Sequence, residues 1–192
     1  MLQLQNDFTP EVLMNRISVS SITKTALCTA LICISAYLSF PLPLTPIPVT
    51  AQTIAINITA ILLTPAQTAA ALGVYLLLGF CGIPVFSGGT AGFSQLLSPT
   101  GGFLIGFFVA AVLISLLKGK KNNPLRHCLI CIFVGIPAVD LFGALFMCLI
   151  HHYSPLAALS GAILPFLFGD VLKAIGGALI GTSVNRLLAI RK

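Results

Sequence analysis

Three ionisable residues, Asp140, Asp170 and Lys173, lie within otherwise apolar stretches of the sequence. At the centre of a bilayer such a group costs at least roughly 2.5–3.5 kcal/mol on insertion scales, so it indicates a partner or a function. Asp170 and Lys173 are three positions apart, which places both on one face of a helix, where each lowers the cost of burying the other. A carboxylate accepts hydrogen bonds and an ammonium donates them. The pair therefore suits a small polar ligand head that carries N–H groups and a carbonyl.

The residues alone leave other interpretations of these charges open. Asp170 and Lys173 can form a structural ion pair that fixes their helix to its neighbours, and Asp140 can pair with Lys173 or meet water. An intramembrane enzyme could use Asp140 and Asp170 as acid and base, which requires two carboxyl groups of different acidity in one cavity. A proton-coupled carrier could cycle a proton on Asp170.

A glycine-rich, uncharged segment from Ile83 to Phe103 is the longest connection between apolar runs. Its glycines at 88, 89 and 92 let the backbone approach a ligand closely, and Phe86 and Phe93 offer flat apolar surfaces between them. Irregular backbone at membrane depth is tolerated only where it is buried or lines a cavity, so we expect a lid that folds inward. Packing of the loop against the bundle is the alternative. The chain has no G-x-x-x-x-G-K-[ST] motif, so it has no P-loop with which to hydrolyse ATP.

A second uncharged connection is rich in proline. Residues 41–53 read PLPLTPIPVTAQT, and prolines with no charges give a stiff, extended segment that cannot continue the preceding helix. This strap is longer than a simple turn requires, so we expect it to lie across something, with Gln52 just after it as a further polar contact.

The cysteines and histidines point to packing rather than to metal chemistry. Cys128-x-x-Cys131, beside His127, resembles half of a zinc or redox motif, but no second half completes it. His151 and His152 lie in a short connection, where a solvated loop accounts for them. We expect no metal and no cofactor.

The composition places these residues in a membrane. Of 192 residues, 57% are hydrophobic and only 7% are charged, against roughly 25% charged in soluble domains, which excludes the soluble and disordered classes. The apolar runs lack the alternation of strands, so we expect an all-α, integral membrane bundle forming a single domain. Residues 1–21 form a cytoplasmic or interfacial tail, and the six predicted spans are about 22–40, 50–63, 65–82, 101–118, 126–150 and 156–185.

The basic residues predict the orientation of this bundle. If six spans alternate, nine of the ten Lys and Arg residues fall on one side, and the connections 41–49, 83–100 and 151–154 on the other side contain none. The positive-inside rule makes the first side cytoplasmic, together with both termini. The net charge of +6 thus reflects the topology and an attraction to the anionic head groups of the lipid bilayer. We expect no nucleic-acid partner.

With these residues in view, the chain resembles the BioY family, the biotin-specific substrate-binding (S) component of energy-coupling factor (ECF) transporters. The resemblance covers nearly the whole chain from about residue 20. Three motifs carry it in this order: PLTPIPVTAQT (43–53), PVFSGGTAGFSQLLSPTGGFLIGF (84–107) and PFLFGDVLKA (165–174).

The resemblance implies a multi-pass protein of the cell (inner or cytoplasmic) membrane that takes up biotin without being an enzyme. Biotin would lie near the external side, under the first two external loops, with its polar head at Asp170 and Lys173. The remaining contacts it implies are Phe86, Ser87, Gly88, Gly89, Thr90, Phe93, Gln95 and Gln52. The implied partners are a membrane coupling protein and two ATP-binding subunits, which would dock on the small-residue face of Ala26 and Ala30.

Overall fold

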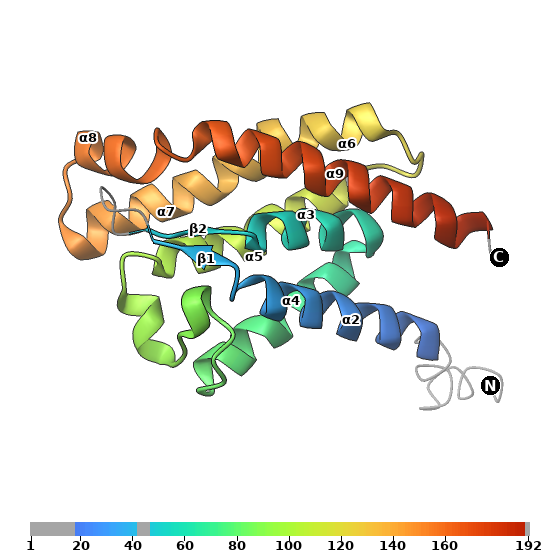
Figure 1. The fold of residues 1–192 in the computed structure, drawn as a ribbon, viewed down its shortest axis with the longest axis horizontal. Coiled ribbons are helices and arrows are strands. Elements are labelled where there is room, and N and C mark those ends of the chain that lie inside the picture. The colour runs from blue at the N-terminus through green and yellow to red at the C-terminus, as the bar shows by residue number, and fades with distance from the viewer. Residues whose placement is uncertain (1–17, 42–46, 191–192) are drawn as a thin grey trace, which may run out of the picture.

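The computed structural model describes residues 18–41 and 47–190, and the side chains up to residue 188. Helices form nearly all of its regular structure (Figure 1). The helices, in chain order, are α2 (Val19–Ser35), α3 (Gln52–Leu62), α4 (Pro65–Phe80), α5 (Gly101–Leu117), α6 (Pro124–Ile130), α7 (Ile136–His151), α8 (Pro155–Ala158) and α9 (Leu167–Ile190). A π-helical turn at Cys131–Gly135 joins α6 to α7 as one long helix, and another at Leu159–Ile163 extends α8. The tail predicted for residues 1–21 falls mostly outside the described residues.

Local sequence explains where several helices begin. The hydroxyl of Thr64 accepts a hydrogen bond from the backbone N–H of Gln67, and the side-chain Oε1 of Gln67 accepts one from the backbone N–H of Thr64. A full capping box therefore opens α4, with Pro65 at its first position. The side chains of Asn123 and Ser154 accept backbone hydrogen bonds at the starts of α6 and α8, and each is followed by a proline. These caps account for where α4, α6 and α8 begin.

Glycines let the helices of the bundle pack closely. Gly177 and Gly181 of α9 lie against α3, where a Cβ atom at Gly177 would come within 3.0 Å of a backbone oxygen. Gly102 and Gly106 of α5 do the same against α7. Small residues at such crossings are typical of helix pairs in membranes. The pairs α3 with α9 and α5 with α7 are the most extensive contacts between helices, and the ligand cavity described below lies between them.

The sixth predicted span, 156–185, is not one continuous helix. The π-helical extension of α8 ends at Ile163, the chain turns at residues 164–166, and α9 starts at Leu167. Pro165 explains the break, since proline has no N–H to donate and its ring clashes with the preceding turn. The break places Phe166 and Asp170 at the start of α9.

A small antiparallel sheet departs from the all-α prediction. Strands β1 (Ser39–Phe40) and β2 (Val49–Thr50) pair with Ser39 opposite Thr50 and Phe40 opposite Val49. β1 directly precedes the proline strap and β2 lies within it; residues 42–46 between them lie outside the described part. Extended backbone on both sides of the prolines allows this pairing, because proline disfavours helix in the residue before it.

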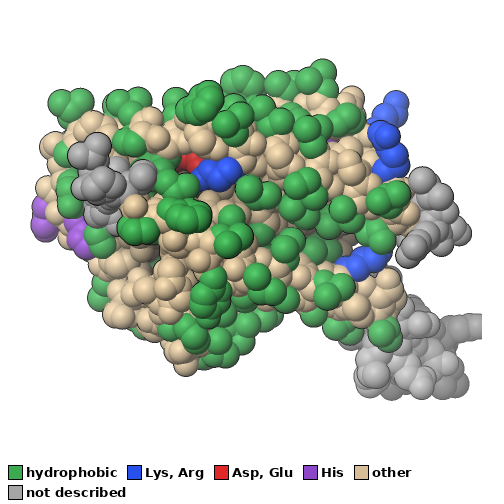
Figure 2. All heavy atoms as spheres, in the orientation of Figure 1, with side chains coloured by type: hydrophobic (Ala, Val, Ile, Leu, Met, Phe, Trp, Pro, Cys, Tyr) green, Lys and Arg blue, Asp and Glu red, His purple; other side chains and the backbone are tan. Residues whose placement is uncertain are grey.

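Many hydrophobic side chains lie on the surface of the bundle, as the face drawn in Figure 2 shows. Two helices are long and apolar enough to cross a bilayer: Pro124–His151, with mean hydropathy 2.3, and Leu167–Leu188, with 1.4. Only 17% and 28% of their most apolar windows are buried, so these helices are not the core of a soluble fold. Four shorter apolar helices, α2, α3, α4 and α5, complete the bundle.

Candidate functional site

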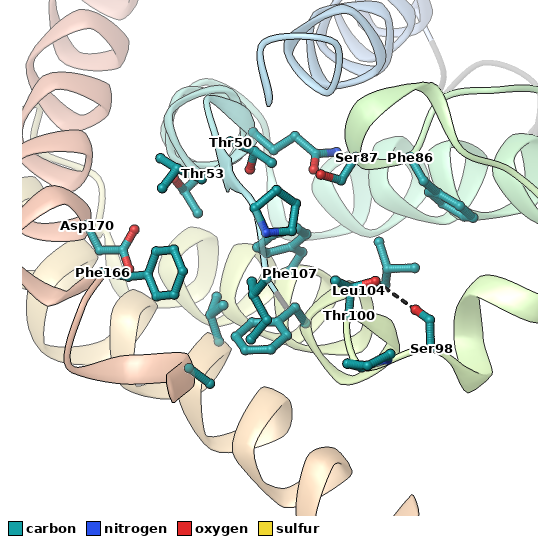
Figure 3. A pocket seen from close by; sticks show the side chains of 18 of the residues that line it. Thr50, Thr53, Phe86, Ser87, Ser98, Thr100, Leu104, Phe107, Phe166 and Asp170 are labelled. Carbon is teal, nitrogen blue, oxygen red and sulfur yellow. Dashed lines mark hydrogen bonds between the residues drawn. The ribbon is translucent and has the colours of Figure 1, made fainter. Parts of the chain in front are cut away.

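A cavity of about 310 Å³ lies between the two loops and the helices α3, α5, α7 and α9 (Figure 3). This volume is at the lower end of the roughly 300–1,000 Å³ that small-molecule sites occupy. Its wall is mostly apolar, with a few polar side chains converging on the interior. The cavity therefore suits one small ligand that has an apolar body and polar ends.

Asp170 and Lys173 form an ion pair at the wall of this cavity. Lys173 Nζ lies 2.6 Å from Asp170 Oδ1, and the side chains are 16% and 17% exposed, respectively. Lys173 also donates a hydrogen bond to the carbonyl oxygen of Thr50 at 3.4 Å, which ties α9 to β2 of the strap. Both residues line the cavity, so the pair can bind a ligand and can also fix α9 to its neighbours as a structural ion pair.

Asp140 lines the same cavity from α7. Within the described residues it makes no ion pair, and Lys173 is paired with Asp170 instead. Two carboxyl groups and a single ammonium thus line one cavity. Asp140 is therefore not the partner of Lys173, and its carboxyl group is open to ligand or water.

The polar residues and glycines predicted to contact the ligand do not all line the cavity. Ser87, Thr90, Gln95 and Gln52 line the cavity. Gly88 and Gly89 do not line it, and their N–H groups donate to the carbonyl oxygens of Ala36 and Phe86. Both glycines have positive φ, 68° and 77°, which explains the residue type at these positions. Their backbone therefore shapes the loop and joins it to the end of α2.

The two predicted aromatic contacts have different surroundings. The ring of Phe86 is 1% exposed and packs edge-on against Tyr75 and Phe80, with ring centroids 5.5 Å and 5.3 Å apart, so it anchors the loop to α4 at the edge of the cavity. Phe93 is 62% exposed, contacts Phe80 and lies outside the cavity wall. Of the two rings expected to flank a ligand, Phe86 therefore borders the cavity and Phe93 does not.

Other aromatic residues supply the apolar wall instead. Phe103 and Phe107 of α5 and Phe166 before α9 line the cavity. A sequence signal existed for Phe166, because it lies four and seven positions before Asp170 and Lys173, on the same helical face. The remaining polar lining that we did not predict comes from Thr50, Thr53, Ser98 and Thr100; the Oγ atoms of Ser98 and Thr100 are 2.7 Å apart (Figure 3).

The backbone adds to the electrostatics of the site. Helices α3 and α5 both begin at the cavity, with Gln52, Thr53 and Thr100 at or beside their first turns. The positive ends of these helix dipoles favour a negative group nearby. Together with Lys173 they offset the two carboxyl groups, so the cavity can accept a ligand that carries a carboxylate.

The residues expected to meet a partner subunit lie away from the cavity. Ala26 and Ala30 are exposed on α2, one turn apart. Among the described residues no three His, Cys, Asp or Glu side chains form a group that could hold a metal ion, and the six cysteines are free thiols.

Comparisons with known proteins agree on one family. The sequence profile of the BioY family matches residues 10–190. Biotin transporter BioY2 of Lactococcus lactis is 35% identical over 176 residues, which are 92% of this chain and 96% of the relative. Biotin transporter BioY of Thermotoga maritima is 32% identical over 166 residues, covering 85% and 95% of the two chains. The crystal structure of the S-component for biotin from an ECF-type ABC transporter superposes with a TM-score of 0.81 at 28% identity, covering 93% of this chain and 95% of that one.

Proposed function

This chain belongs to the BioY family, and on that premise we propose that it takes up biotin as the substrate-binding S component of an ECF transporter. The observation that carries the proposal is the mostly apolar cavity with the Asp170–Lys173 ion pair in its wall. Biotin has a polar bicyclic head, an apolar body and a carboxylate, which matches this distribution of polar and apolar wall. The protein acts by binding and translocation, and no residue is assigned to covalent chemistry.

The polar head of biotin fits the side of the cavity with Asp170 and Lys173. The carboxylate of Asp170 can accept from the N–H groups of the head, and Lys173 can donate to its carbonyl. The aromatic wall of Phe103, Phe107 and Phe166 suits the apolar body. Ser87, Thr90, Gln95 and Gln52 supply polar groups from the loops and the start of α3.

The topology follows from the same proposal. Six membrane crossings, with α8 and α9 together making the last, place the start of α2, the α5–α6 connection and the end of α9 at the cytoplasmic face. These segments lie at one end of the bundle, and the loops that cover the cavity lie towards the other end (Figure 1). The cavity then receives biotin from the external side of the cell membrane.

Release of biotin into the cell requires energy that this chain does not supply, since its sequence has no P-loop. The partners are a membrane coupling protein and two ATP-binding subunits of an ECF module. The exposed Ala26 and Ala30 of α2 form the docking face.

Isothermal titration of the detergent-solubilised protein with biotin and desthiobiotin tests the substrate and the site together. Asp170→Asn and Lys173→Met should each weaken biotin binding by about tenfold or more, because each leaves a buried charge without its partner. Lys121→Met, which removes an exposed lysine outside the cavity, should bind as the unmodified protein does. An absence of heat with the unmodified protein at micromolar biotin would show that the substrate is wrong. Normal affinity in both cavity variants would show that the site is wrong.

A further inference from the structure

Asp140 shares one end of the ligand cavity with the ion pair of Asp170 and Lys173. The three residues line the cavity together, Asp140 from α7 and the pair from α9. Asp140 and Asp170 also both border a small cavity that adjoins the ligand cavity. Asp140 interacts electrostatically with both members of the pair. Two carboxyl groups and one ammonium, the groups that form strong hydrogen bonds, therefore lie near one another.

The opposite side of the cavity carries hydroxyl groups. Ser98 and Thr100 lie there, across the cavity from Asp170 (Figure 3). Helix α5 begins beside them, and the positive end of its dipole favours a negative group. At the other end, two carboxyl groups against one ammonium disfavour a ligand carboxylate. An elongated ligand with one carboxylate therefore places its uncharged head at Asp140, Asp170 and Lys173.

Asp140 has no partner of its own within residues 18–41 and 47–190. It forms no hydrogen bond or ion pair there, whereas Asp170 is paired with Lys173 at 2.6 Å. The side chain of Asp140 is half-buried in a helix that is apolar enough to cross a bilayer. An ionisable group in such a helix is costly and calls for a partner or a function. A ligand that donates a hydrogen bond to Asp140 supplies the missing partner.

We propose that Asp140 is a specificity-determining residue that accepts a hydrogen bond from one N–H group of a cyclic urea, while Asp170 accepts one from the other. A cyclic urea has two N–H donors and one carbonyl acceptor, and this end of the cavity offers two carboxyl groups and one ammonium. The two N–H groups point to opposite sides of the ring, so a single carboxylate cannot accept from both. Lys173 donates to the carbonyl between them. The inference rests on the proposed function, since biotin is the ligand that carries this urea.

Isothermal titration of Asp140→Ala with biotin and desthiobiotin tests the contact. Both ligands carry the cyclic urea, so both should bind about tenfold more weakly and by the same factor. Asp140→Asn keeps a carbonyl acceptor without the charge, so its loss should be smaller, about threefold. Leu141→Ala is the matched control on α7, because Leu141 is 63% exposed and is not part of the cavity wall. Its affinity should equal that of the unmodified protein.

Unchanged affinity for biotin in Asp140→Ala would overturn the proposal. A loss for only one of the two ligands would also overturn it, because Asp140 would then contact a part of biotin other than the urea. If Asp140→Ala does not fold, the near-isosteric Asp140→Asn takes its place, and full affinity in that variant would contradict the proposed contact.

Methylation of the ring nitrogens separates a direct contact from an effect on packing. The two isomers of biotin that carry a single N-methyl group each lack one N–H donor, so each should bind the unmodified protein about tenfold or more weaker than biotin. In Asp140→Ala one isomer should come within about threefold of biotin, since its methyl group replaces a hydrogen bond that is already lost. The other isomer should remain about tenfold weaker than biotin. If neither isomer recovers, Asp140 does not contact the urea.

These measurements also separate the role of Asp140 from the proposed function. If the unmodified protein does not bind biotin, the proposed function fails and the role of Asp140 fails with it. If the unmodified protein binds biotin and the Asp140 variants bind it equally well, only the role of Asp140 fails.

Discussion

Gln52 lies in the wall of the cavity with one hydrogen bond already made inside the protein. Its Nε2 donates to the hydroxyl of Tyr75 at 2.8 Å, and the two side chains are 1% and 0% exposed. This bond directs the other end of the amide, Oε1, away from Tyr75 and leaves it to accept from a ligand. Tyr75 also packs against Phe86 of the loop. Tyr75 is thus a positioning residue that the sequence did not reveal, because nothing in its local context distinguishes it from a packing residue of α4.

Tyr75→Phe removes the hydroxyl and keeps the ring. We expect biotin to bind about tenfold more weakly, since the Gln52 amide loses a buried partner and its fixed direction. Isothermal titration of a double-mutant cycle with Gln52→Ala measures this effect. In the Gln52→Ala background Tyr75→Phe should cost little. An equal loss in both backgrounds would mean that the hydroxyl acts on packing and not through Gln52.

At the same scale, the ion pair was predictable and the placement of the two loop phenylalanines was not. The i, i+3 spacing of Asp170 and Lys173 is a local property of one helix, so it could be read from the sequence, and the two side chains do form an ion pair. The placement of Phe86 and Phe93 depends on how a glycine-rich loop folds against α4. Composition alone cannot decide which of two phenylalanines in such a loop turns inward.

The loop that covers the cavity packs closely against helix α4. A Cβ atom at Gly79 would lie 2.1 Å from Cζ of Phe86, so the ring of Phe86 occupies the space that any other side chain at position 79 would need. The loop is further joined to the strap side, where the Tyr37 hydroxyl donates to the Pro84 carbonyl oxygen at 2.6 Å. The lid therefore has two attachments, one to α4 and one to the segment after α2.

Gly79→Ala tests the first attachment. The added methyl group must displace the Phe86 ring, so we expect a looser lid, weaker biotin binding and faster biotin dissociation. The loss should be about tenfold, because overpacking of a buried site typically costs roughly 1–3 kcal/mol. Gly73→Ala is the matched control, since a Cβ atom there meets nothing within 4 Å and alanine favours the helix. Radiolabelled biotin dissociation measures the difference, and equal rates in both variants would contradict the role given to Phe86.

At the scale of the elements, apolar runs predict where helices form but not where they break. The capped start of α4 and the uniformly apolar stretch of α5 leave little choice of structure. Pro165 lies within an apolar run, where proline predicts either a kink or a full break, and only packing against the cavity decides which. The pairing of β1 with β2 is also tertiary, since two-residue strands carry no sequence period.

For the molecule as a whole, charged side chains and apolar side chains occupy different parts of the surface. On the face shown in Figure 2, most Lys and Arg side chains lie at the end of the bundle where α2 begins and α9 ends, while hydrophobic side chains are spread along its length. The composition predicted this division, because so few charges can cover only the ends of a bundle. The apolar sides serve contact with lipid or with another membrane subunit. Most of them carry large side chains such as Leu27, Leu141 and Phe168, which suit lipid.

Ala26 and Ala30 place small side chains, in place of large ones, on the surface of α2. Substituting them can separate biotin binding from biotin transport. Exposed small residues one turn apart allow another helix to approach closely, so a large side chain should prevent docking without touching the cavity. We expect Ala26→Trp and Ala30→Trp to retain biotin affinity in detergent and to lose most biotin uptake in cells that express the full ECF module. Ala70→Trp, at a similarly exposed alanine on α4, should retain both. Uptake that survives in the α2 variants would place the docking face on another helix, whereas loss of binding would mean that α2 shapes the cavity itself.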